Sequence, residues 1–215
     1  IEYEGDLDWS PSILFLITIN KNTMAGCVIT SGRGYFCGGQ VGGIKKIFLA
    51  NYYDANAITG VTASATTGVV SAITNTSALD FFEFDLDRQA SSFNQTILTG
   101  KGGAVAYQSE IEMQLSHDSE ESWARMQNIV EGLWQVIVLD NNGVYYLVGV
   151  ENGVEITGGT YAHGGDVAYG DYVGYVINMT GAEPLPAYNM SATSPFTTFS
   201  SDLTLSATQY DTAQV

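Results

Sequence analysis

In the stretch Val105-Ala-Tyr-Gln-Ser-Glu-Ile-Glu-Met-Gln-Leu115, apolar and polar positions alternate along the chain. Its odd-numbered positions are mostly apolar, and its even-numbered positions include Gln108, Glu110, Glu112 and Gln114. Successive side chains of a β-strand point to opposite faces of the sheet. The period of two therefore predicts a strand that buries one face and keeps the other face acidic and in water.

Similar runs lie on both sides of this stretch and indicate a mainly β fold. We expect strands over 45–51, 81–87, 92–98, 134–140, 144–150, 155–160 and 171–179, and a short one near 203–205. Within 81–87, Phe82, Phe84 and Leu86 should share one face. Asn141-Asn-Gly143 separates two apolar runs and predicts a β-hairpin, because Asn and Gly accept the positive φ of a tight turn.

One helix is expected, over about 118–132. Asp118 is a suitable N-cap, and Glu121 follows at the spacing of a capping box. Apolar residues then recur at helical spacing: Trp123, Met126, Val130 and Leu133. This stripe could line a ligand groove, but core packing is the better interpretation.

The segment 52–78 is rich in Ala, Thr, Ser, Gly and Val and carries one charge, Asp54. It shows no helical spacing. We interpret it as either a long β-hairpin or a loop that becomes ordered against a neighbouring molecule.

The charge balance restricts the function. Seven Lys and Arg residues stand against 23 Asp and Glu residues, which gives a net charge of −16. Such a chain repels phosphate, so specific nucleic-acid binding through basic contacts is a poor interpretation. The acidity either serves solubility or makes one face non-adhesive toward DNA.

Patterns typical of enzymes and cofactor sites are missing from the sequence. The Gly-rich run 38–43 lacks the Lys-Ser/Thr of a phosphate-binding loop. His117 and His163 have no nucleophile motif beside them, and Glu110 with Glu112 has the ordinary spacing of a solvated strand face. We therefore predict a protein that is not an enzyme and that uses neither a cofactor nor a metal.

The N-terminal region leaves two questions open. Cys27 and Cys37 could form a disulfide or remain two buried thiols. Residues 1–23 contain an apolar run that is too short to span a membrane and lacks the basic flank of a secretory signal. They form either an extension or a strand-forming arm. We expect a main β domain at 24–187 and a Ser/Thr-rich extension at 188–215.

Two groups of motifs resemble a known family. The first is Met24-Ala-Gly-Cys27, Thr30-Ser-Gly-Arg33, Cys37 and Val41-Gly-Gly-Ile-Lys45. The second is Val144-Tyr-Tyr-Leu-Val-Gly-Val-Glu-Asn-Gly153, the turn 157–159, Gly170-Asp171 leading to Gly174-Tyr175, and Pro186-Ala187. Together they are similar to the tail tube (major tail) proteins of bacteriophages that infect Bacteroidetes and marine bacteria. Residues 1–23 and the tail after Ala187 depart from the pattern.

The resemblance implies a β-sandwich or barrel flanked by a helix, with extended termini. Six copies would close into rings, the rings would stack into a tube in the virion tail, and assembly would take place in the cytoplasm of the host bacterium. The implied partners are further copies, the tail terminator, tape measure and baseplate proteins, and double-stranded DNA that passes without specific binding; a membrane is not among them.

Residues can be assigned to this architecture. We expect Gln108, Glu110, Glu112 and Gln114 to face the bore. Contacts between subunits or rings are expected from seven residues of the segment 52–78: Tyr52, Tyr53, Ile58, Val61, Val69, Val70 and Ile73. The alternatives are another virion component of related fold (a tail terminator, baseplate or head-decoration protein) or a secreted β-sandwich adhesin.

Overall fold

Residues rich in Val, Ile, Phe and Tyr form strands in the computed structural model, which describes residues 39–207 except 88–89, 101, 117–119 and 164–171. The fold is mainly β, as predicted. In chain order the elements are β1 (Ile44–Asn51), β2 (Gly60–Ala63), β3 (Val70–Thr74), β4 (Leu79–Asp85), β5 (Ser92–Thr99), β6 (Val105–Ser116), α1 (Glu120–Val130), β7 (Leu133–Asp140), β8 (Tyr145–Val148), β9 (Val154–His163), β10 (Val173–Glu183), β11 (Tyr188–Asn189), α2 (Pro195–Thr198) and β12 (Leu203–Leu205).

Ten of the described strands form one sheet in the order β12-β4-β1-β7-β9-β10-β6-β5, and β8 with β11 branches from β7. Its pairings are antiparallel except that of β12 with β4. The predicted hairpin at Asn141-Asn-Gly143 connects β7 to β8, and Gly143 has a φ of 87°. β2 and β3 pair with each other as a separate hairpin.

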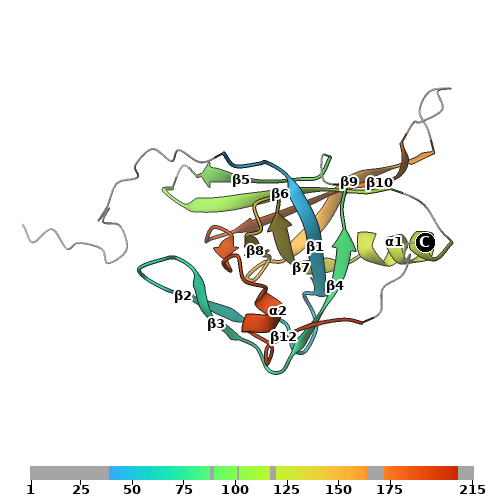
Figure 1. The fold of residues 1–215 in the computed structure, drawn as a ribbon. Helices are drawn as coiled ribbons and strands as arrows, with labels where there is room; N and C mark the ends of the chain where they lie inside the picture. Colours follow the sequence, from blue (N-terminus) through green and yellow to red (C-terminus); the bar gives the residue numbers. More distant parts are fainter. Residues whose placement is uncertain (1–38, 88–89, 101, 117–119, 164–171, 208–215) are drawn as a thin grey trace, which may run out of the picture. The chain divides into compact units, whose positions relative to one another are not determined.

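A first core lies between two parts of this sheet (Figure 1). Ile47 of β1, Phe84 of β4 and Val136 of β7 supply one side, and Met113 of β6 and Ile177 of β10 supply the other. The segment after β4 closes one corner, because the Asp87 amide donates to the Gln114 carbonyl of β6 at 3.2 Å. The two parts of the sheet therefore cover each other's apolar faces.

A second core lies on the opposite face of β1 and β7. Phe48 and Ile137 pack there against Ile58 and Ile73 of the β2–β3 region and against Phe199 near the chain's end. The strands β1, β4 and β7 are thus covered on both faces. Residues 188–205, expected to be an extension, contribute Met190, Phe199 and Leu203 to this core and include the expected strand at 203–205.

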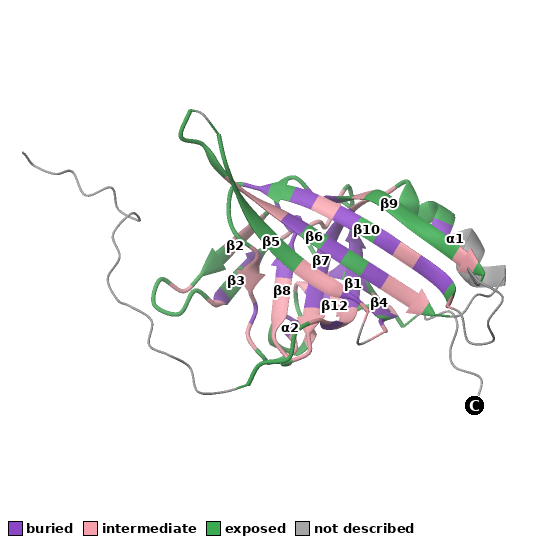
Figure 2. Cartoon of the chain, turned by 90° about the horizontal axis from the view of Figure 1, so that it is seen from above, coloured by how far each residue is buried: buried purple, intermediate pink, exposed green. Residues whose placement is uncertain are grey.

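The period-two prediction for β6 is confirmed. Ile111 and Met113 are buried, whereas Glu110 and Glu112 are exposed. Figure 2 shows buried and exposed residues alternating along β6 and β10, which lie side by side with β5 and β9. Val105, at the start of the strand, is 48% exposed because it lies beyond the core.

The predicted helix is present as α1, with narrower bounds of Glu120–Val130. Its buried residues are Met126 and Ile129, whereas Val130 is 53% exposed, so the expected position of Val130 in the stripe was wrong. The helix ends at Val130, and Leu133 already belongs to β7, so the two residues are not on one helix face. Asp118 and the side chains of Glu121 and Trp123 lie outside the described residues. A second helix, α2, was not predicted.

The segment 52–78 contains the β2–β3 hairpin, which is one of its two predicted forms. The pattern at 81–87 was partly wrong, because Phe82 is exposed and Phe81 is fully buried. Phe81 faces the second core, where it contacts Phe196 edge-on with ring centres 5.8 Å apart. Both faces of β4 are covered, so alternation alone could not assign its buried side.

Candidate functional site

One face of four neighbouring strands, β9-β10-β6-β5, turns away from the first core and forms the candidate site. The strand registers place its side chains in rows that cross the sheet. One row joins Asn94, Glu110, Thr180 and Glu155, and the next row joins Ser92, Glu112, Asn178 and Gly158. We call this surface, defined by these two rows, the acidic face.

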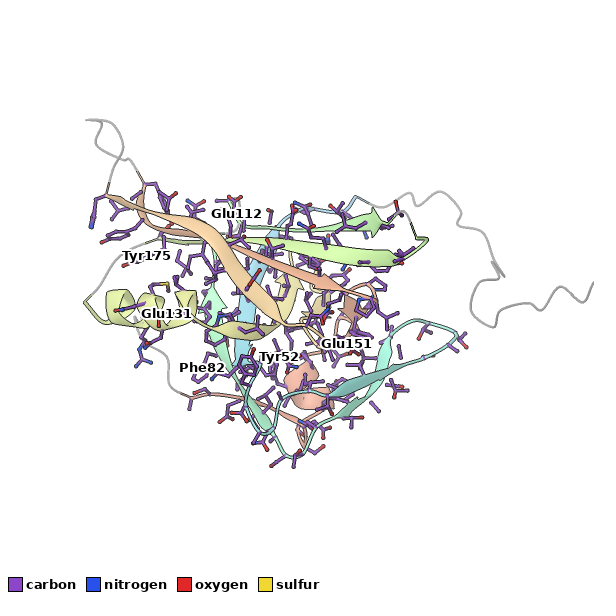
Figure 3. The ribbon with its side chains drawn as sticks, turned by 180° about the vertical axis from the view of Figure 1, so that it is seen from behind. Tyr52, Phe82, Glu112, Glu131, Glu151 and Tyr175 are labelled. Carbon is purple, nitrogen blue, oxygen red and sulfur yellow. The ribbon has the colours of Figure 1, made fainter. Side chains whose placement is uncertain are left out.

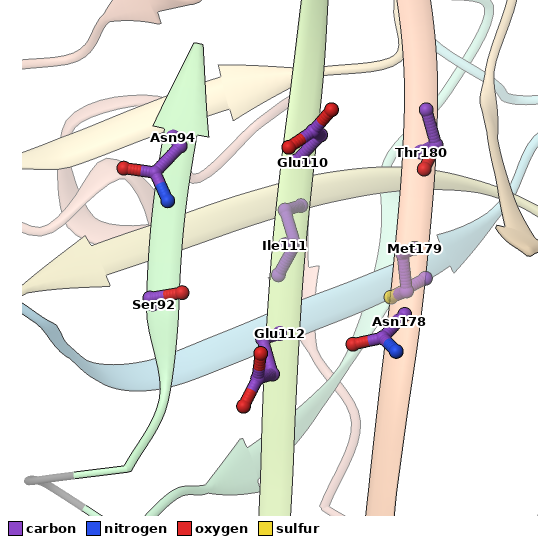
Figure 4. Close-up of a pocket in the computed structure, with 8 residues that line it drawn as sticks. All are labelled: Ser92, Asn94, Glu110, Ile111, Glu112, Asn178, Met179 and Thr180. Carbon is purple, nitrogen blue, oxygen red and sulfur yellow. The ribbon is translucent and has the colours of Figure 1, made fainter. Parts of the chain in front are cut away.

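Carboxylates and amides gather around an open hollow of about 170 Å³ on the acidic face (Figure 4). Glu110 and Glu112 project from the central strand, flanked by Asn94 on β5 and Asn178 on β10. The Gln108 amide donates to the Glu110 carboxylate at 3.0 Å. Glu112 is also labelled in Figure 3, on the side of the fold away from Tyr52 and Glu151.

All four residues expected to line a bore lie on this same face of β6. Gln108 and Gln114 are half-buried, and Glu110 and Glu112 are exposed. Glu155, which the sequence pattern did not indicate, is exposed and lies opposite Thr180 at the start of β9. A register shift between Asn178 and Met179 breaks the alternation in β9, so a count of parity along the chain could not assign Glu155 to a face.

The described basic residues lie elsewhere in the fold. Lys46 of β1 pairs with Glu83 and with Asp85 of β4, the latter at 3.0 Å. The hydrogen bond from Lys46 to Glu83 raises the pKa of Lys46 above its usual 10.5, although partial burial opposes the shift. Among the described residues of the acidic face, the charged side chains are therefore Glu110, Glu112 and Glu155.

The acidic face lies between two open strand edges. Among the residues that the structure describes, β5 ends the sheet on one side, with β6 as its partner. β9 pairs with β10 along its length, but on its other side the described pairing with β7 is confined to Val154 and Glu155. Open edges expose backbone N–H and C=O groups and are usually protected by charged residues or proline. Neither β5 nor the stretch Thr157–Thr160 contains a charged residue or a proline.

The directions of these edges are complementary. The pairings β5–β6, β6–β10 and β10–β9 are all antiparallel, so β5 and β9 run in opposite directions. When two copies stand side by side in the same orientation, β5 of one copy therefore meets β9 of the next as an antiparallel neighbour. Head-to-tail contacts of this kind produce rings when the rotation between copies closes.

The seven residues expected at contacts between copies fall into two groups. Ile58, Val70 and Ile73 are buried in the second core, so their side chains stabilise the chain itself and the expectation of a surface contact fails for them. Tyr53 is 84% exposed. Tyr52, Val61 and Val69 are half-buried, and the Tyr52 hydroxyl donates to the Glu151 carbonyl (Figure 3).

Other site predictions remain untested. Cys27 and Cys37 lie outside the described residues. In the part of the chain that the structure describes, no group of three or more His, Cys, Asp or Glu side chains is arranged to hold a metal ion. The described helices are all too short or too polar to cross a bilayer. Comparison with known proteins finds no matching family model, curated protein or solved structure.

Proposed function

We propose that this chain is a structural subunit of a bacteriophage tail tube. In this proposal copies join through β5 and β9 into rings, and the sixfold symmetry of the rings comes from the family resemblance alone. The acidic faces form the inner wall of each ring, and stacked rings conduct double-stranded DNA. The fold would then be a tail-tube-like β-sandwich that acts in the virion, with terminator, tape measure and baseplate proteins as partners and without enzymatic activity.

The observation that carries the proposal is the pair of uncharged open edges on either side of the acidic face. A chain with a net charge of −16 repels its own copies, so contacts between copies are most favourable where carboxylates are absent. β5 and Thr157–Thr160 meet that condition. Edge pairing would also satisfy the exposed backbone groups of both strands.

The acidic face supports the second half of the proposal, the passage of DNA. Each copy contributes at least Glu110, Glu112 and Glu155 to the same surface. Carboxylates at a wall repel phosphates, and the hydroxyl and amide groups between them offer no positive charge to hold the duplex. Such a wall would let DNA slide.

Charge reversal on the acidic face tests this proposal. We expect a variant with Glu110→Lys, Glu112→Lys and Glu155→Lys to form tubes that retain linear double-stranded DNA during sedimentation, whereas unsubstituted tubes release it. The effect should weaken as salt rises from 50 to 200 mM, because phosphate contacts are screened (about 10³-fold or more in affinity for 6–10 contacts). The control variant carries Asp54→Lys, Glu131→Lys and Glu151→Lys, which change the net charge equally at exposed acids outside this face.

The proposal fails for DNA passage when tubes of the triple-lysine variant retain no more DNA than tubes of the control.

Tube length separates the proposed role of tail tube subunit from the roles of related virion proteins. A tail terminator or baseplate protein would form rings that do not stack, whereas a tail tube subunit forms stacks of many rings.

A further inference from the structure

The open edges also carry information about the alignment of neighbouring copies, and this inference rests on the proposed function. We infer that β5 of one copy pairs with β9 of the next in one register, in which Leu98 lies opposite the neighbour's Gly158. Ile97 then lies opposite the neighbour's Gly159, and Thr96 lies opposite the neighbour's Thr160. The occupant of each open edge is thus a second copy of this chain.

Two large apolar side chains are exposed on the β5 edge. Ile97 is 62% exposed and Leu98 is 41% exposed. They point to opposite faces, because Leu98 pairs with Ala106 on the same side of the sheet as the acidic face, whereas Ile97 pairs with Tyr107 on the core side. Exposed apolar residues on an unprotected edge strand form a template for pairing with another chain. β5 carries no charged residue, so it offers no ion pair to a charged partner. An equally uncharged strand edge, such as that of β9, is the surface that it fits.

Two adjacent glycines lie on the open edge of β9. A Cβ atom at Gly159 would approach the Val176 carbonyl oxygen to 2.6 Å, so contacts within the chain account for that glycine. Gly158 differs, because a Cβ atom there would meet no heavy atom within 4 Å and its φ is not in the left-handed region. Glycine within a strand marks a β-bulge or a position that another backbone approaches closely. Gly158 adjoins the register shift opposite Asn178 and Met179, and its open side also leaves room for a neighbouring strand. Large side chains on the neighbouring strand can cover such glycines.

The faces of the two strands select the register. Gly158 lies in the row of Asn178 and Glu112, on the acidic face, and Leu98 lies on the same side of the sheet. Gly159 lies opposite Ile177, on the core side, as Ile97 does. In antiparallel pairing, placing Leu98 opposite Gly158 also places Ile97 opposite Gly159. A shift of the register by two residues leaves each side chain on the same face of the sheet, but it moves Leu98 and Ile97 away from the two glycines.

Cysteine cross-linking tests the register in the full chain. Disulfides require Cα atoms about 4.4–6.8 Å apart, which directly opposite residues meet and diagonal neighbours at about 7–8 Å do not. We expect the Thr96→Cys/Thr160→Cys variant to give a ladder of covalent oligomers under mild oxidation. The variants Thr96→Cys/Gly158→Cys and Thr96→Cys/Ala162→Cys represent the two shifted registers and should give less.

Two controls accompany these variants. The unsubstituted chain retains Cys27 and Cys37 and measures background cross-linking. Thr96→Cys alone detects two-fold pairing of β5 with β5. The register is overturned if either shifted pair gives a stronger ladder than Thr96→Cys/Thr160→Cys. The β5–β9 contact is overturned if, in assembled particles, none of the double-cysteine variants gives a stronger ladder than the two controls. If the unsubstituted chain forms no oligomer at any concentration, the proposed function itself fails.

Discussion

A buried side-chain amide links the segment just before β2 to the large sheet. Gln135 of β7 is fully buried. Its side-chain oxygen accepts a hydrogen bond from the Ile58 amide at 2.9 Å, and its side-chain nitrogen donates to the Ile58 carbonyl at 2.7 Å. The side chain therefore satisfies both backbone groups of a residue that is itself buried in the second core.

Gln135→Leu should destabilise the protein strongly. The substitution leaves the N–H and C=O of Ile58 buried without a partner, at a cost of about 1–3 kcal/mol for each group. We expect the free energy of unfolding, measured by urea denaturation, to fall by about 2–4 kcal/mol. Gln127→Leu on the exposed face of α1 is the matched control and should change it by less than about 0.5 kcal/mol. Equal effects of the two substitutions would contradict this role for Gln135.

Lys46 makes a pH-dependent contribution on the β1–β4 surface. Its pKa is raised chiefly by the hydrogen bond to Glu83, so the folded state favours the protonated amine. The resulting stabilisation is complete below the unfolded-state pKa of 10.5 and is lost as pH rises through the higher folded-state pKa.

Lys46→Met should therefore destabilise the protein at pH 8 and have a smaller effect at high pH. We expect a loss of less than about 1 kcal/mol at pH 8, because the pair is partly exposed and screened by solvent. The difference between the two proteins should shrink as the pH rises above 10.5. A difference that stays constant in urea titrations from pH 8 to pH 12 would show that packing of the side chain, rather than its charge, is responsible.

Among the elements, the open edges of β5 and β9 are the surfaces proposed to join neighbouring copies. Both edges are uncharged, so the introduction of a charge should block pairing with a neighbour without altering the fold. We predict that Thr96→Glu and Thr160→Glu each reduce oligomer formation in sedimentation velocity experiments. Both positions are exposed, so the free energy of unfolding should change by less than about 0.5 kcal/mol.

Thr197→Glu, at an exposed position of α2, is the control for added charge. Oligomers of Thr96→Glu or Thr160→Glu that match those of this control in size and amount would exclude β5 and β9 from the contact.

The buried side of a strand was predictable from the sequence where one face is covered, as in β6, and was not predictable in β4, which is covered on both faces. The alternation in β6 placed Glu110 and Glu112 in water because one face of that strand packs on the first core. At the start of β4, Phe81 packs into the second core, whereas Phe84 packs into the first core on the opposite face. Phe81 is therefore buried, and Phe82 is exposed. The cover over Phe81 comes from residues near 196–203, and no local pattern could reveal it.

The candidate site was predictable only in part for the same reason. Parity along β6 grouped its four polar residues, but the open edges depend on which strands become neighbours. Among the described residues β9 has an open edge because β7 pairs with β8 from Val136 to Leu139 and meets β9 only at Val154 and Glu155. That outcome depends on contacts between residues far apart in sequence.

In the whole molecule, the net charge opposes association of copies, whereas the open strand edges favour it. A net charge of −16 keeps copies apart, whereas the uncharged edges of β5 and β9 offer backbone pairing. Salt screens the repulsion between exposed charges, with a Debye length of about 10 Å at 0.1 M. Assembly should therefore be favoured by higher protein concentration and by moderate salt.

Negative-stain electron microscopy of the purified chain, over a range of concentrations in 0.15 M salt, tests whether copies close into rings through β5 and β9. The account predicts closed rings at intermediate concentrations and stacks of rings with an open centre at high concentrations. A population of single molecules at every concentration, with β5 and β9 intact, would contradict it.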